Sequence, residues 1–150
     1  MATSIKHQLF FQHPPSAVWE YLTNAALMEL WLMKSNFQPV LGHEFQFRIS
    51  PMPKFEFDGI VYCKVLEIEP FKKLSYSWKL GPGDGSTNLD SVVRWELQPK
   101  DNGTQLLLDH GGFTVLKNTG IFDAFNVGWL QNMKKIAARL NDTNHGTTNA

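Results

Sequence analysis

Residues 118–141 read NTGIFDAFNVGWLQNMKKIAARLN, and this stretch decides the fold. Its large apolar residues recur at steps of three and four, which is the spacing of one face of an α-helix. They are Phe122, Phe125, Trp129, Met133, Ile136 and Leu140. A helix with such a stripe must bury it, and the large apolar partner that this chain offers is one face of its own sheet. We therefore expect a sheet packed around one long C-terminal helix.

Short alternating segments before this helix predict an antiparallel sheet of about six strands. Apolar and polar residues alternate in five of them, as in strands with one buried face, at 5–11, 44–49, 74–80, 91–97 and 105–110. A sixth segment, 57–69, is apolar on both parities, so its inward face cannot be assigned and we expect a bulge. Asn102-Gly103 predicts a hairpin between the last two strands, because both residues tolerate positive φ.

Two short helices are expected between the first and second strands. Pro14 and Pro15 suit the first turn of one helix, since proline fixes φ and needs no hydrogen bond there. Asn24, with Thr23, supplies cap oxygens for the next helix. The apolar residues expected on the buried side of that second helix are Leu27, Leu30 and Trp31. The expected fold class is therefore α+β, with a curved antiparallel sheet wrapped around the C-terminal helix.

The composition is that of a soluble globular protein. Hydrophobic residues make up 43% of the 150 residues, and Lys plus Arg equal Asp plus Glu at 14 each, so no net charge attracts nucleic acid. No apolar run is long enough to span a membrane, and the N-terminal residues do not resemble a secretory signal. A lone Cys63 agrees with a reducing compartment, so we expect a cytoplasmic protein. Residues 1–141 are expected to form one domain, and 142–150 a disordered polar tail.

Several stretches carry a resemblance to a known family. They include KVLEIEPFKKLSYSW at 64–78, SVVRWELQPKDNGTQLLLDHGGF at 91–113 and Gly128-Trp129 in the last helix. Through them the chain resembles the START-like superfamily, also called SRPBCC, which shares its fold with the birch pollen allergen. Within it, the chain is similar to the family named for the C-terminal domain of the activator of heat-shock protein 90 ATPase. The resemblance implies a helix-grip fold and, as in many relatives, an interior cavity, but no one reaction.

Contact with the chaperone is not expected from this resemblance. The activator itself works through an additional N-terminal domain that binds the middle segment of the chaperone. This chain begins directly with the first expected strand, so we expect that domain to be missing. A chaperone-interacting stress-response module is kept as a third interpretation, and an exposed apolar patch on the outer sheet surface would favour it. The sequence leaves a homodimer open.

The strongest candidate site lies between the inner face of the sheet and the last helix. The alternation of apolar and polar residues in the strands and the helical spacing direct aromatic side chains into this space. These side chains carry few polar atoms. The candidate ligand-binding residues are Trp31, Phe47, Tyr76, Trp78, Trp95, His110, Phe122, Phe125 and Trp129. Such a pocket suits a small apolar or aromatic ligand, such as a lipid-like or aromatic metabolite. The alternative is that these rings pack against one another as ordinary core.

His110 and Tyr76 are the candidate catalytic residues, for a pocket enzyme of the cyclase, hydratase or isomerase type. An imidazole titrates near neutrality and could transfer protons there. The competing interpretation is a structural histidine, hydrogen-bonded to the backbone or to Tyr76, and no carboxylate partner can be assigned. We expect no metal, because no His, Cys and carboxylate cluster has ligand spacing, and no cofactor, because the glycines at 81–85 lack the context of a phosphate loop.

Overall fold

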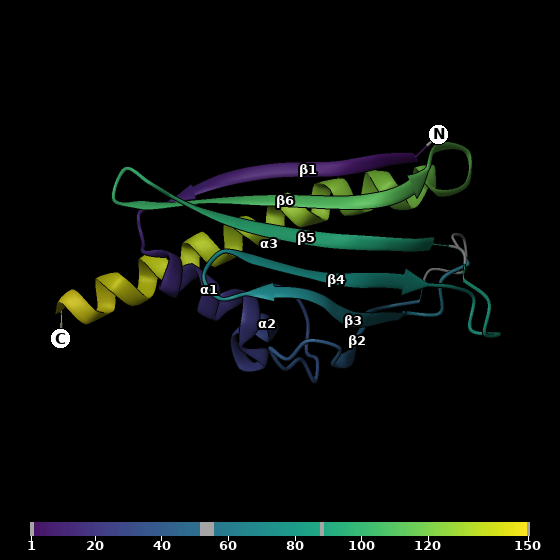
Figure 1. The fold of residues 1–150 in the computed structure, drawn as a ribbon, viewed down its shortest axis with the longest axis horizontal. Coiled ribbons are helices and arrows are strands. Elements are labelled where there is room, and N and C mark those ends of the chain that lie inside the picture. Colours follow the sequence, from purple (N-terminus) through teal and green to yellow (C-terminus); the bar gives the residue numbers. More distant parts are fainter. Residues whose placement is uncertain (1, 52–55, 88, 150) are drawn as a thin grey trace.

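A six-stranded antiparallel sheet and three helices make up the fold, in a computed structural model that describes residues 2–51, 56–87 and 89–149. The strands are β1 (Ala2–Phe11), β2 (Glu44–Arg48), β3 (Ile60–Glu69), β4 (Lys73–Leu80), β5 (Leu89–Lys100) and β6 (Gly103–Thr114). The helices are α1 (Pro15–Thr23), α2 (Ala25–Trp31) and α3 (Val115–Asn149). The order of the strands in the sheet is β1-β6-β5-β4-β3-β2, and α3 lies across one face of the sheet (Figure 1). This is the expected α+β helix-grip fold.

Helix α3 buries its apolar stripe against the sheet, as the sequence predicts. It contacts β1 and β6 and also both short helices. The stripe is fully buried over its C-terminal part, at Trp129, Met133, Ile136 and Leu140, and half-buried at Phe122 and Phe125. Burial of each such side chain contributes about 1.5–3 kcal/mol, which is enough to hold the helix on the sheet.

Two histidines of the β1 region also attach α3 to the sheet. His7 Nε2 donates a hydrogen bond to the backbone oxygen of Asn126 at 2.8 Å. His13 Nε2 donates to Oδ1 of Asn141 at 2.8 Å, near the other end of the helix stripe. The N-terminal segment and α3 are therefore joined by directional bonds as well as by packing.

The hairpin between β5 and β6 is confirmed, but its turn lies one residue earlier than Asn102-Gly103. The register pairs Lys100 with Gly103, so the two turn residues are Asp101 (φ 49°) and Asn102 (φ 63°). Gly103 is already in β6, where a Cβ would overlap the carbonyl oxygen of Phe11 in β1. Glycine is therefore required here for close approach of two strands and not for positive φ.

The expected bulge in the segment 57–69 lies between Val65 and Glu67 of β3. Before it, Val61, Cys63 and Val65 point inward and are buried. The extra residue, Leu66, is exposed, and the inward parity resumes one residue later. The bulge explains why Ile68 is apolar although it lies on the other parity from Val65.

The expected buried side of α2 is confirmed for Trp31 and for half-buried Leu27, but it is wrong for Leu30. Leu30 is exposed, and Met28 is buried together with Trp31. The cap is as expected, because Oδ1 of Asn24 accepts hydrogen bonds from the backbone N–H groups of Ala26 and Leu27. A seven-residue helix has only two turns, so three apolar residues could not fix its orientation before its neighbours were known.

Helix α3 is longer than the expected segment 118–141. It begins at Val115 and continues to Asn149, over most of the expected tail at 142–150. No proline follows Asn141, so nothing in the sequence interrupts the backbone hydrogen bonds there. Despite this length, the described residues include no helix that is both long and apolar enough to cross a membrane.

We predict that Gly103→Ala destabilises the protein by about 1–3 kcal/mol, because a Cβ there collides with backbone that cannot move aside. Gly128→Ala in α3 is the matched control, since nothing lies within 4 Å of its added Cβ. It should stabilise the protein by about 0.5–1 kcal/mol through helix propensity. Urea unfolding of both variants measures the two effects. Equal effects of the two substitutions would contradict the close approach of β6 to β1.

Candidate ligand-binding site

Trp78 lies at the centre of an aromatic cluster on the inner face of the sheet. Its ring centroid is 5.5 Å from Phe47, 5.5 Å from His110, 5.9 Å from Phe125 and 5.2 Å from Trp129. The first two neighbours come from strands and the last two from α3. Edge-to-face and tilted pairs of this kind add about 0.5–1.5 kcal/mol each beyond burial. The cluster thus joins the helix to the sheet.

A second group of rings fills the space towards α2. Trp95 lies between Trp31, at 5.9 Å, and Trp129, at 5.5 Å, with nearly perpendicular ring planes in both pairs. Trp31 Nε1 donates to the backbone oxygen of Tyr21 at 2.7 Å, and Trp95 Nε1 donates to Oη of Tyr76 at 3.0 Å. Trp31, Trp95 and Tyr76 are each 1% exposed, so this part of the interior is filled core.

His110 is held in one protonation state by a chain of hydrogen bonds. Trp129 Nε1–H donates to Nδ1 of His110 at 2.9 Å. Nδ1 must therefore be the acceptor nitrogen, and Nε2 carries the proton that is donated to Oγ of Ser91 at 2.9 Å. The Ser91 hydroxyl in turn donates to the backbone oxygen of Trp78 at 2.6 Å. Both nitrogens of the imidazole are thus engaged within the protein.

Burial reinforces this state of the imidazole. His110 is fully buried, and desolvation of its charged form lowers the pKa to about 3. Burial also disfavours the charged form of Tyr76, which is the phenolate, and therefore raises the pKa of Tyr76 far above its usual value. Neither group changes its protonation near neutral pH. Gly112 (φ 113°) allows these hydrogen bonds to form, because its missing Cβ lets β6 approach Ser91.

A pocket of about 190 Å³ opens beside the aromatic cluster, between the end of α2, the end of β2 and α3. Its lining residues are apolar apart from one amide and the indole nitrogens. They are Leu32, Met33, Ile49, Trp78, Phe125, Gly128, Trp129 and Asn132. Gly128 leaves open space where other residues would place a Cβ. The pocket therefore exists partly because a glycine occupies this position of the helix.

Trp78, one of the lining residues, carries an unused hydrogen-bond donor. Its Nε1 is the one buried side-chain nitrogen or oxygen in the described part of the chain that has no hydrogen-bond partner. Trp78 itself is 2% exposed. A buried donor without a partner costs about 1–3 kcal/mol, and native structures contain few of them. This donor is the feature of the pocket that most needs an explanation.

Three of the nine residues proposed from the sequence line the pocket: Trp78, Phe125 and Trp129. The structure places Trp31, Phe47, Tyr76, Trp95 and His110 in the packed cluster behind it, and half-buried Phe122 against Phe113 at 5.3 Å. Sequence reasoning missed Leu32, Met33, Ile49, Gly128 and Asn132. A glycine inside a helical apolar stripe was the available signal, since it often marks a packing or functional position.

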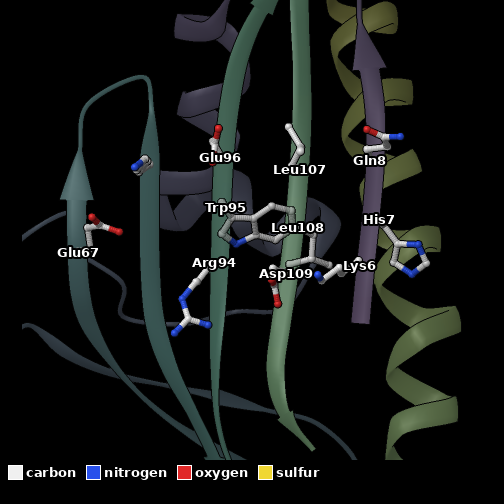
Figure 2. Close-up of a pocket in the computed structure, with 11 residues that line it drawn as sticks. Lys6, His7, Gln8, Glu67, Arg94, Trp95, Glu96, Leu107, Leu108 and Asp109 are labelled. Atoms are coloured by element: carbon white, nitrogen blue, oxygen red, sulfur yellow. The ribbon is translucent and has the colours of Figure 1, made fainter. Parts of the chain in front are cut away.

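The opposite face of the sheet carries a larger hollow of about 530 Å³ (Figure 2). Its charged side chains alternate along neighbouring strands with the buried ones. They are Lys6, Lys73 and Arg94, against Glu67, Glu96 and Asp109. Three positive and three negative side chains leave this hollow without a net charge. The large exposed hydrophobic residues nearby are also separated, with Phe10 on β1 and Tyr62 and Leu66 on β3, which three strands divide.

Metal ligands do not gather anywhere in the described residues, where no group of three or more His, Cys, Asp or Glu side chains could hold an ion. Cys63 is buried on β3, and burial raises the pKa of its thiol. A protonated, buried thiol is a poor nucleophile. The chemistry of the site is therefore that of apolar contact, with the Asn132 amide and the unpartnered indole N–H of Trp78 as its polar groups.

Solved structures share this fold over almost the whole chain. Protein MLL2253 from Mesorhizobium loti is 33% identical, with a TM-score of 0.82, and the match covers 94% of this chain and 98% of that one. BH1534 from Bacillus halodurans is 22% identical, with a TM-score of 0.71 and coverage of 91% and 95%. CalU16 from Micromonospora echinospora is 21% identical, with a TM-score of 0.70 and coverage of 93% and 74%.

A comparison with curated proteins found no match. The family model described as Activator of Hsp90 ATPase homolog 1-like protein, however, matches residues 12–141, from the residue after β1 to a point within α3. This match and the similar structures confirm the resemblance inferred from the sequence. The chain belongs to the family of Activator of Hsp90 ATPase homolog 1-like proteins.

Proposed function

We propose that this protein binds a small apolar ligand in the pocket between α2, β2 and α3. The observation that carries the proposal is the pocket itself, about 190 Å³ of space lined by apolar and aromatic side chains next to a packed aromatic cluster. The fold is compatible with a ligand-binding module. The role fits a carrier or sensor of a lipid-like or aromatic metabolite.

The size and lining of the pocket support this proposal. An engineered apolar cavity of about 150 Å³ binds benzene, so about 190 Å³ accommodates one substituted ring. Trp78, Phe125 and Trp129 offer ring faces and edges to such a ligand. Each Å² of apolar surface removed from water contributes roughly 25 cal/mol, so a monocyclic ligand gains several kcal/mol before ordering costs.

Proton transfer by His110 and Tyr76 receives less support from the geometry. Both nitrogens of His110 are bonded within the protein, and Oη of Tyr76 accepts from Trp95. Neither side chain lines the pocket. A general acid or base needs a proton that can move between it and the ligand. We therefore assign His110 a positioning role, in which it holds Trp129 at the pocket wall.

We predict that Gly128→Leu abolishes saturable binding of toluene, because the new side chain occupies the space beside Gly128. The same substitution should leave the fold intact and raise its stability by about 1 kcal/mol through helix propensity. Titration of the labelled protein with toluene, followed by backbone amide NMR shifts, measures binding. In the unsubstituted protein the shifts should centre on Leu32, Met33 and Trp129.

Val127→Leu is the matched control for this experiment. Val127 precedes Gly128 in α3, is exposed and does not line the pocket, so binding should be unchanged. Toluene shifts that persist in Gly128→Leu, or that appear on the opposite face of the sheet, would overturn the proposed site. Absence of any saturable shift in the unsubstituted protein would overturn the proposed function.

We predict that His110 stays neutral, with the proton on Nε2, as the pH falls to about 5. Its folded pKa is about 3, and the unfolded value is about 6.5. The unfolded chain therefore binds more protons between these values, so unfolding free energy falls with falling pH by about 1.4 kcal/mol per unit from this residue. Imidazole nitrogen NMR measures the state directly, with the urea-unfolded chain as control. A pKa near 6.5 for His110 in the folded protein would contradict the hydrogen bonds and the burial that hold the imidazole neutral.

A further inference from the structure

We infer that the ligand of this pocket is a neutral molecule with a carbonyl-type oxygen, and that Trp78 Nε1–H donates a hydrogen bond to this oxygen. The inference rests on the proposed function, because it names the chemical class that the same pocket selects. It goes further in assigning a specificity-determining role to one indole nitrogen. Ketones, esters, amides and lactones with an apolar body meet this description.

The first argument is the contrast among the tryptophans of the core. Trp31, Trp95 and Trp129 each donate their indole N–H to an acceptor of the protein itself. Trp78 lies among the same rings, and its Nε1 has no partner. Of the two indoles that line the pocket, the protein therefore supplies an acceptor to that of Trp129 and none to that of Trp78. A ligand oxygen is the missing acceptor.

The second argument is the charge of the lining. None of the eight lining residues is ionisable, and Asn132, half-buried, is the one that carries a polar side chain besides the two tryptophans. A carboxylate or an ammonium group would be desolvated there without a counter-ion, which is strongly unfavourable. A neutral oxygen needs only one donor. The pocket therefore favours neutral acceptors over acids and amines.

The third argument concerns access to the donor. Nε1 of Trp78 reaches almost no solvent, so an acceptor must displace a neighbouring side chain to meet it. Leu32, Met33 and Phe125 line the pocket and are only half-buried. The unbranched side chain of Met33 can adopt many rotamers at small cost. These half-buried side chains are less tightly enclosed than the fully buried rings behind Trp78, so we expect them to be the ones that a ligand displaces.

Acetophenone and α-methylstyrene provide a matched test. Both are planar and similar in shape, and they differ in one position, where the ketone has an oxygen and the alkene has a methylene group. We expect acetophenone to gain affinity from the Trp78 donor, and the alkene to gain none. The affinity ratio of the two probes is measured in the unsubstituted protein and in Trp78→Phe. The different hydration of the two probes contributes equally to both ratios, so it cancels when the ratios are compared. The ketone preference should fall by about twofold to tenfold in the variant.

Indole NMR of the unsubstituted protein gives a second readout that needs no folded variant. The Nε1–H resonance of Trp78 should move downfield on saturation with acetophenone and stay in place with α-methylstyrene. The bonded indoles of Trp31, Trp95 and Trp129 should respond equally to both probes. Their contrast with Trp78 separates a hydrogen bond from a general effect of filling the pocket.

The possible outcomes distinguish this inference from the proposed function. Saturable binding of both probes, with a Trp78 shift for the ketone alone, supports both proposals. Saturable binding of both probes with identical Trp78 shifts, or with a ketone preference that survives Trp78→Phe, overturns the hydrogen bond and leaves the apolar pocket in place. Failure of both probes to bind overturns the proposed function and the inference together.

Discussion

The hydrogen bond from Trp129 of α3 to His110 of β6 is the interaction on which the rest of the interior depends. It fixes the rotation of the helix that apolar burial holds on the sheet, and it continues through Ser91 to the backbone oxygen of Trp78. This series of hydrogen bonds ends on the backbone carbonyl of Trp78, and the indole nitrogen of the same residue has no partner. The same residue, Trp78, thus takes part in the hydrogen-bonded core and carries the donor that the core leaves unused. The pocket begins where this chain ends, at the wall formed by Trp78 and Trp129.

Most of the fold could be predicted from periodicity, because strong patterns leave few alternatives. The stripe from Trp129 to Leu140 requires a large apolar partner, and the alternating strands provide it. Details set by tertiary neighbours could not be read this way. The turn at Asp101 and Asn102 depends on the close approach of Gly103 to β1, and the orientation of α2 depends on what covers Met28. Local propensity does not contain this information.

The candidate site was predicted less completely, for a related reason. Strand parity directs Phe47, Tyr76, Trp95 and His110 inward, and they are indeed buried, but parity does not say which inward rings interlock and which border empty space. Their packing places the pocket at one side of the cluster, where Leu32, Met33 and Ile49 complete it. A cavity is a property of how volumes fit together, so it appears only when all neighbours of a residue are known.

The most direct test of an open apolar pocket is a crystal structure of the protein under xenon pressure. Xenon enters dry apolar cavities without needing a hydrogen bond or a charge, so it reports space alone. We expect a xenon atom beside Gly128, in contact with Trp78, Phe125 and Trp129. Side chains that fill this space and exclude xenon, or xenon bound only elsewhere, would contradict the central claim that an open apolar site lies between α2, β2 and α3.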